Sequence, residues 1–217
     1  EGRVYFKRLG MNTFAEQAKI GSAIRNGDEM KVDNKSFAAV IYIDDRSILK
    51  IRENTKFSFI DTRNSRTIDI KHGTILNDIK KEKRKKDYRI QTSVSVASVK
   101  GTEFAAIVNM DGVDQFICKE GSFEVLNMIS GETVNIMTGQ KAVSNSIGNL
   151  VQTPASPREY PPDPEIDDKI VEPRAEPISQ KESQPIEPKS GGNDKEQPID
   201  EYTQVDANDT KINEKVQ

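Results

Sequence analysis

Residues 88–120 read YRIQTSVSVASVKGTEFAAIVNMDGVDQFICKE, and this stretch decides the class of fold. The runs 88–92, 94–99 and 103–108 are rich in the β-branched and aromatic residues that favour strands. Asp111-Gly112 predicts a hairpin turn, because glycine adopts a positive φ at little cost. Residues 114–119 then return as another strand. Short strands with turn signals about every 8–12 residues are typical of an all-β sandwich, barrel or solenoid.

The same pattern extends in both directions along the chain. Strands are expected at 4–6, 37–43, 47–51, 57–60, 67–70, 122–126, 133–136 and 141–143. We expect one helical turn within Asn12–Ile20. Leu76–Lys86 has a helix-forming composition, but we prefer an extended strand over Ile75–Ile79 that leads into a charged loop. Seven apolar side chains are expected in the core: Val96, Val99, Phe104, Ile107, Phe116, Phe123 and Val125.

Composition divides the 217-residue chain into two parts. All eight phenylalanines lie at or before Phe123, and all ten prolines lie at or after Pro154. Residues 151–217 carry 16 acidic and 8 basic side chains, although the whole chain has a net charge of only −3. The sequence therefore predicts a β domain over residues 1–148 and a disordered, Pro/Glu-rich acidic tail over 149–217, without packed structure beyond about residue 152.

No enzyme class is indicated by the motifs of the chain. The phosphate-loop, nucleophile-elbow and zinc-protease patterns are absent. His72, the only histidine, is expected at a strand-to-turn position on the surface. Cys118, the only cysteine, shares a strand face with Phe116 and is expected to be a buried apolar residue. We therefore expect a protein that is not an enzyme, with no cofactor and no metal.

One dense basic run stands out, at Lys80, Lys81, Lys83, Arg84, Lys85 and Lys86. The simplest interpretation is a solvated loop between strands. The alternative is a weak, salt-sensitive contact with an anionic partner: lipid headgroups, lipopolysaccharide or the chain's own acidic tail. Nucleic acid is not indicated, because no aromatic residues alternate with the basic ones. Asp44-Asp45 lacks the oxygen spacing of a calcium loop and is interpreted as a hairpin turn.

The turn motifs together resemble those of the FecR domain family. The matching segments are GSAIRNGDEM (21–30), SFAAVIYIDDRSILKI (36–51), NTKF (54–57), GTI (73–75), TSVSVASVKGTEF (92–104), EGSFEV (120–125) and GQ (139–140). The resemblance covers residues 1 to about 145 and implies an antiparallel β sandwich of jelly-roll or helix-like winding. Its structural turn residues would be Gly27, Asp28, Asp44, Asp45, Gly73, Gly101, Thr102, Gly121 and Gly139. Two residues depart from the family pattern: Arg46 stands in place of glycine, which predicts an altered turn, and Ser93 stands where proline is frequent.

The resemblance implies a non-catalytic binding, scaffold or signal-receiving module of the bacterial envelope, whose ligand is a protein or another envelope component. Its best-known members are transmembrane regulators of sigma factors that receive a signal from a TonB-dependent transducer, and this chain could be the periplasmic part of one. A carbohydrate-binding jelly roll is a third hypothesis. The chain opens with Glu1-Gly2 rather than methionine, so we expect a signal peptide to have been removed and the protein to be periplasmic or extracellular.

Overall fold

The computed structural model describes residues 1–81, 86–164 and 166, which form fifteen strands and one short 3-10 helix. The elements are β1 (Val4–Lys7), β2 (Glu16–Gln17), β3 (Glu29–Val32), β4 (Ala38–Ile41), β5 (Ile48–Ile51), β6 (Thr55–Asp61), β7 (Ser65–Asp78), β8 (Asp87–Gln91), β9 (Ser95–Val99), β10 (Glu103–Val108), β11 (Val113–Glu120), β12 (Ser122–Asn127), β13 (Thr133–Met137), β14 (Gln140–Asn145), β15 (Leu150–Pro154) and η1 (Pro157–Glu159). The all-β fold class predicted from the sequence is confirmed.

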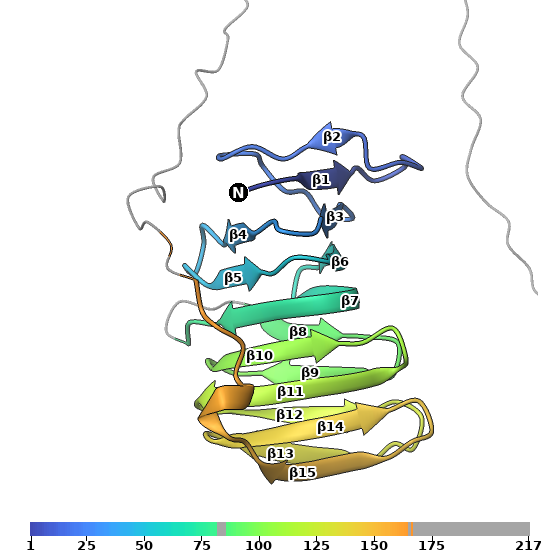
Figure 1. The fold of residues 1–217 in the computed structure, drawn as a ribbon, viewed down its shortest axis with the longest axis vertical. Coiled ribbons are helices and arrows are strands. Elements are labelled where there is room, and N and C mark those ends of the chain that lie inside the picture. Colours follow the sequence, from blue (N-terminus) through green and yellow to red (C-terminus); the bar gives the residue numbers. More distant parts are fainter. Residues whose placement is uncertain (82–85, 165, 167–217) are drawn as a thin grey trace, which may run out of the picture. The chain divides into compact units, whose positions relative to one another are not determined.

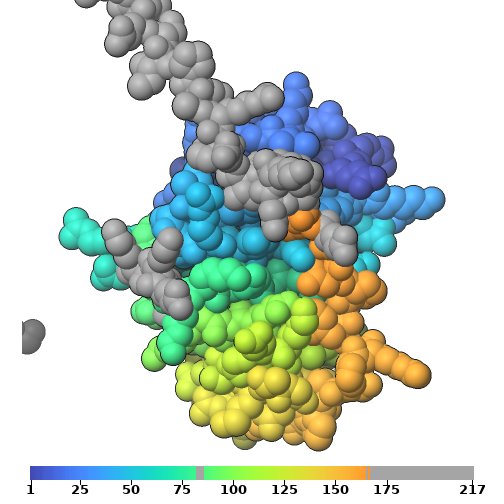
Figure 2. All heavy atoms as spheres, turned by 90° about the vertical axis from the view of Figure 1, so that its left-hand side faces the viewer, coloured from blue at the N-terminus to red at the C-terminus, as the bar shows by residue number. Residues whose placement is uncertain are grey.

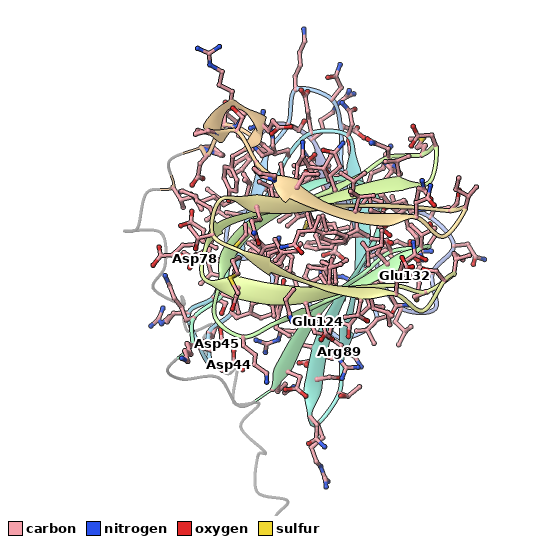
Figure 3. The ribbon with its side chains drawn as sticks, turned by 90° about the horizontal axis from the view of Figure 1, so that it is seen from below. Asp44, Asp45, Asp78, Arg89, Glu124 and Glu132 are labelled. Atoms are coloured by element: carbon pink, nitrogen blue, oxygen red, sulfur yellow. The ribbon has the colours of Figure 1, made fainter. Side chains whose placement is uncertain are left out.

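The strands form two facing layers, sheet A and sheet B, that share one strand (Figure 1). Sheet A has the order β2-β1-β3-β6-β7-β8-β9-β12-β13, and sheet B the order β4-β5-β7-β10-β11-β14-β15. Figure 3 views the two layers from below, with side chains filling the space between them. This is the antiparallel sandwich that the sequence predicts, with one exception, the parallel pair β7–β8.

The shared strand β7 explains that parallel pair. Its first half pairs with β6 in sheet A, and its second half, from Gly73, pairs with β10 in sheet B. Gly73 has a φ of 109°, and a Cβ there would collide with Thr55, so only glycine fits this bend. The chain then returns to sheet A, and β8 runs beside β7 in the same direction. One turn of helical winding therefore lies within the sandwich.

The core follows from the period-two pattern of the strands. In β6, Thr55, Phe57 and Phe59 are buried while the residues between them are partly exposed. The largest fully buried side chains include Phe57, Phe104 and Phe116. The rings of Phe104 and Phe123 lie 4.8 Å apart across the two layers, so sheet packing is dominated by aromatic and branched residues.

Five of the seven expected core residues are buried, and two are only partly buried. Val96 and Ile107 lie on the opposite faces of β9 and β10 from Ala97 and Ala106, so they point away from the space between the sheets. These strands carry apolar residues on both faces, so their sequence does not show which face points into the core. Cys118 is buried in the core beside Phe116, as predicted.

Two local predictions are corrected and one is confirmed. Residues 12–20 hold no helical turn; they contain β2, which pairs with the edge of β1. Residues 75–78 belong to β7, so a strand that leads into a loop is confirmed there, rather than a helix. His72 lies within β7 rather than before a turn, with Nδ1 at 2.9 Å from the carbonyl of Asn54. Strands β3 and β15 were not anticipated.

The β structure also continues past residue 148, where the domain was expected to end. Strand β15 pairs with β14 from Leu150 to Pro154, and the next residues pack on the outer face of sheet B. The rest of the expected tail, apart from Ile166, lies outside the described residues from 165 onward. The helix η1 has three residues, far fewer than the roughly 20 that a helix needs to cross a bilayer.

Candidate functional site: the turn edge

Most of the predicted turn residues gather along one edge of the sandwich, which we call the turn edge. It comprises the turn residues 26–28, 42–47, 62–64, 79–81, 86, 100–102, 121 and 138–139, on the left of Figure 1. Figure 2 looks onto this edge, where colours from blue to yellow succeed one another from top to bottom. Gly73 does not belong to it; its bend lies at the other end of the strands, beside Thr55 and Arg52.

The turn edge is where the chain crosses between the sheets in its second half. Strand β7 ends in sheet B and β8 begins in sheet A; residues 100–102 then lead back to sheet B, Gly121 crosses again, and 138–139 make the last crossing. Gly101, Gly121 and Gly139 have φ values of 91°, 93° and 75°, which other residues adopt at a cost. The turn motifs at these three glycines are therefore crossovers between the sheets, and each glycine has a positive φ.

Close contacts stack these crossovers. Thr102 and Ile79 exchange backbone hydrogen bonds of 3.1 Å, and the Thr102 hydroxyl donates to the carbonyl of Ser122 at 2.8 Å. A Cβ on Gly121 would lie 3.0 Å from the carbonyl oxygen of Gly101. Gly139 donates to the carbonyl of Cys118 at 3.1 Å. Burial raises the pKa of the Cys118 thiol to about 11, so it stays protonated and unreactive near neutral pH.

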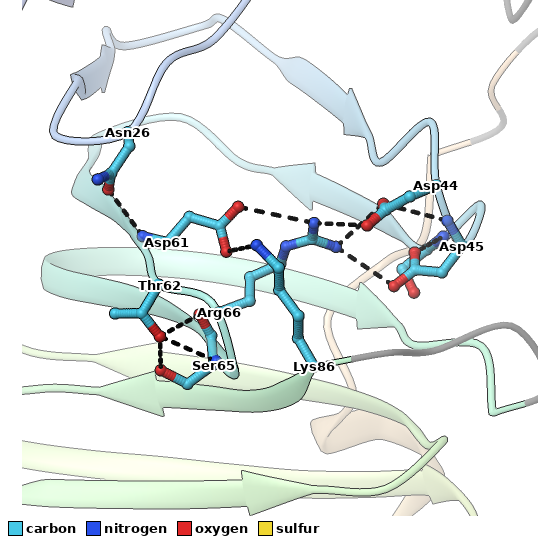
Figure 4. A network of polar contacts seen from close by, with 9 residues as sticks. Asn26, Asp44, Asp45, Asp61, Thr62, Ser65, Arg66 and Lys86 are labelled. Carbon is cyan, nitrogen blue, oxygen red and sulfur yellow. Dashed lines mark hydrogen bonds and ion pairs between the residues drawn. The ribbon is translucent and has the colours of Figure 1, made fainter.

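Arg66 organises the upper part of the turn edge (Figure 4). Its guanidinium lies 3.0 Å from Asp44, 3.2 Å from Asp45 and 3.9 Å from Asp61, and it stacks over the ring of Tyr42 at 3.7 Å. Burial acts against the positive charge, but the carboxylates outweigh it, so the pKa of Arg66 is raised. Removing Arg66 would leave the buried Asp45 carboxylate without its cation, which is costly.

Arg66 was missed at the sequence level, although a signal was present. It stands two residues before Ile68 and four before Ile70, and all three lie on the buried face of β7. An arginine in phase with buried isoleucines requires acidic partners, and Asp44-Asp45 were the candidates. The interpretation of Asp44-Asp45 as a turn was incomplete for that reason: Asp45 accepts from Ser47 N–H at 2.8 Å, and both aspartates also bind Arg66.

Arg46, in the same turn, has a φ of 62°, in the left-handed region that favours glycine. Arginine adopts this conformation at a cost of about 1–2 kcal/mol. The altered turn expected from this departure stays a prediction.

Gly27 and Asp28 continue the turn edge above Arg66. Gly27 has a φ of 85° and donates to the carbonyl of Phe59 at 2.8 Å. Asp28 is 1% exposed; it accepts from the backbone of Arg25 at 2.8 Å and forms an ion pair with Arg8. These contacts support a structural role for both residues.

The two ends of the basic run are anchored on this edge. Lys80 lies 2.7 Å from Asp78, and Lys86 lies 2.7 Å from Asp61. Lys81 packs against Gly101, where a Cβ would collide with it. Lys83, Arg84 and Lys85 lie outside the described residues. Among the residues that are described, no group of three or more histidine, cysteine, aspartate or glutamate side chains is arranged to hold a metal ion.

Comparison with known proteins agrees with this architecture. Residues 28–124 match the family described as "FecR protein". These residues form a FecR domain. Two crystal structures, each described as a "putative anti-sigma factor" from Parabacteroides distasonis ATCC 8503, superpose with a TM-score of 0.52 at 14% identity. The likeness covers 58% of this chain and 59% of those chains, so it shows a shared fold. No curated protein matches the chain.

The FecR match places the candidate site within the domain. It begins at Asp28 and ends in β12, so it includes Arg66, the basic run and the crossovers at Gly101 and Gly121. It is shorter than the resemblance inferred from the motifs, which extended from residue 1 to about 145. Gly27 and Gly139 lie outside it.

Proposed function

We propose that this FecR domain is a non-catalytic, signal-receiving module of a bacterial envelope regulator, which contacts a protein partner through the turn edge. The proposal is supported by the family match and by the fold shared with proteins described as anti-sigma factors. A position in the periplasm or outside the cell belongs to the same proposal.

The observation that carries the proposal is the length of one crossover. Three crossings between the sheets use residues 100–102, Gly121 and 138–139, that is three, one and two residues. The crossing between β7 and β8 takes eight residues of sequence, 79–86, which include the six cations of the basic run. Lys80 and Lys86 pair with Asp78 and Asp61, whereas Lys81 is exposed. The other crossings manage without this length or charge, so we assign the exposed cation to recognition of an acidic partner surface.

The test places a photo-crosslinking residue at single positions of the full chain in its native host. Lys81 and Glu120 sample the turn edge. Arg89 and Glu124 are matched controls, because they are exposed on the outer face of sheet A (Figure 3). We expect one envelope protein to be crosslinked from the turn edge and not from the controls.

A second readout is transcription of sigma-factor-dependent genes. Lys81→Glu should lower the turn-edge crosslink and change this transcription, whereas Arg89→Glu should change neither. Equal crosslinking from both surfaces, or transcription that does not respond to Lys81→Glu, would contradict the proposal.

A further inference from the structure

The segment after β15, residues 155–163, crosses the outer face of sheet B, and we call it the strap (Figure 1). It starts where Ala155 donates to the carbonyl of Gly139 at 2.8 Å. A capping box between Ser156 and Glu159 then shapes the short helix η1. Beyond these residues the strap forms no ladder with any strand that the structure describes; side-chain contacts hold it to the sheet.

The face beneath the strap contains an apolar patch. Leu76, Ala105 and Ile117 lie side by side on β7, β10 and β11 and point outward, yet they are 3%, 0% and 2% exposed. Ala155 and Tyr160 of the strap pack against this patch. Apolar patches on an outer sheet face usually mark a contact surface, and here the chain itself covers the patch.

Cations surround the patch and meet the acids of the strap. Lys141 on β14 pairs with Glu159, and Lys50 on β5 pairs with Asp163. Lys119 on β11 lies 3.7 Å from Asp163 and 5.5 Å from the centre of the Tyr160 ring. Two acids and one aromatic ring, spaced along an extended segment, thus match three lysines from three different strands.

The fit of the strap is incomplete. The Tyr160 hydroxyl is buried and has no hydrogen-bond partner among the described residues, which costs about 1–3 kcal/mol. A cavity of about 220 Å³ lies between Tyr160 and Asp163 on one side and Leu76 and Asn77 on the other. The ion pairs are partly exposed, and such pairs contribute about 0–1 kcal/mol each. The strap is therefore held loosely enough to exchange with a better ligand.

We propose that the outer face of sheet B is a docking surface for an extended acidic segment of a partner protein, with an aromatic side chain between its acids, and that the strap occupies this surface in cis. The chemistry of the surface selects such a segment: apolar contact at Ile117, and cations at Lys50 and Lys141 on either side. This surface lies beside the turn edge, and the proposal does not depend on the function of that edge.

The experiment uses the full chain and a fluorescent synthetic peptide with the sequence of residues 156–163, SPREYPPD. Tyr160→Ala combined with Asp163→Ala weakens the strap without altering the sheet. A tethered segment competes at an effective concentration near millimolar, so the double variant should bind the peptide about 10-fold more tightly than the wild type, measured by fluorescence anisotropy. Adding Lys50→Ala should reverse the gain, whereas adding Arg89→Ala should leave it intact.

Tyr160→Phe tests the same idea with the strap retained. Because the hydroxyl is buried without a partner among the described residues, its removal should tighten the strap and lower peptide binding below that of the wild type. Equal peptide binding by wild type, double variant and Tyr160→Phe, or no binding by any of them, would overturn the proposal. If no partner is crosslinked from the turn edge while the variants change peptide binding as expected, only the proposed function is overturned.

Discussion

Gly73→Ala should be among the most destabilising single-methyl additions in the domain. Gly73 lies where β7 passes from sheet A to sheet B, with a φ of 109°. Its new Cβ would collide with the Cα, Cβ and Oγ1 of Thr55, which is fully buried. Backbone strain of about 1–3 kcal/mol and overpacking of about 1–3 kcal/mol add to roughly 2–6 kcal/mol. Such a loss is a large fraction of the stability of a domain, about 5–15 kcal/mol.

Gly139→Ala is the matched control for that prediction. Gly139 also has a positive φ, 75°, but apart from Gly139 and its two neighbours in the chain, no atom of the described residues lies within 4 Å of the position that a Cβ would take. Only the strain of the left-handed backbone remains, about 1–2 kcal/mol. Urea titrations followed by far-ultraviolet circular dichroism measure both free energies of unfolding. The reasoning is refuted if the two variants lose equal stability, because the collision with Thr55 would then contribute nothing.

Three further predictions concern stability. Phe104→Ala should lower the free energy of unfolding by about 3–5 kcal/mol in a urea titration, because the ring is fully buried against Phe123. Phe14→Ala removes a half-buried ring between lysines and should lower it by less than about 1 kcal/mol. Equal losses in the two variants would contradict this prediction. Arg46→Gly should be about 1 kcal/mol more stable than Arg46→Ala. Both variants lack the arginine side chain, and only alanine has a strained backbone at a φ of 62°. A glycine variant less stable than the alanine variant would contradict this prediction. Burial raises the pKa of Asp114 above its ordinary value of 3.8, so ionisation of this carboxyl lowers the stability of the folded protein as the pH rises through the raised pKa. The melting temperature of Asp114→Asn, relative to that of the wild type, should therefore increase between a pH below 3.8 and neutral pH. A difference that does not change with pH would count against this prediction.

The sequence located the strands from β10 to β14 closely, because a turn with glycine separates each strand from the next. Residues 103–108 were predicted as a strand and form β10 with those limits. The first half was harder, since β2 and β3 are short and lack a hydrophobic run: Glu29–Val32 alternates charged and apolar residues over four positions only. Pattern matching detects such strands poorly, because pairing with neighbouring strands stabilises them more than their own propensity does.

The turn edge could be predicted only in part. The glycines were identified, but their gathering on one edge depends on the order of strands in the two sheets, which local patterns do not encode. The strap was missed because a Pro/Glu-rich composition indicates disorder, and yet Tyr160 and Ala155 find an apolar patch on sheet B. That patch was itself hidden, since a strand of continuous hydrophobicity does not show which of its residues face outward.

A layer of buried polar side chains explains how the pair β9–β12 in sheet A and the pair β11–β14 in sheet B keep their register. Ser95 and Asn127 are neighbours in sheet A, and Asp114 and Ser144 are neighbours in sheet B. Ser95 donates to Asp114 at 2.7 Å, and Asn127 donates to Ser144 at 2.8 Å, so each polar residue finds its partner in the opposite sheet. A slip of one residue in any of these strands would leave buried polar groups unpaired, each costing about 1–3 kcal/mol. The apolar residues drive the two sheets together, while this layer selects one pairing among several of similar hydrophobicity.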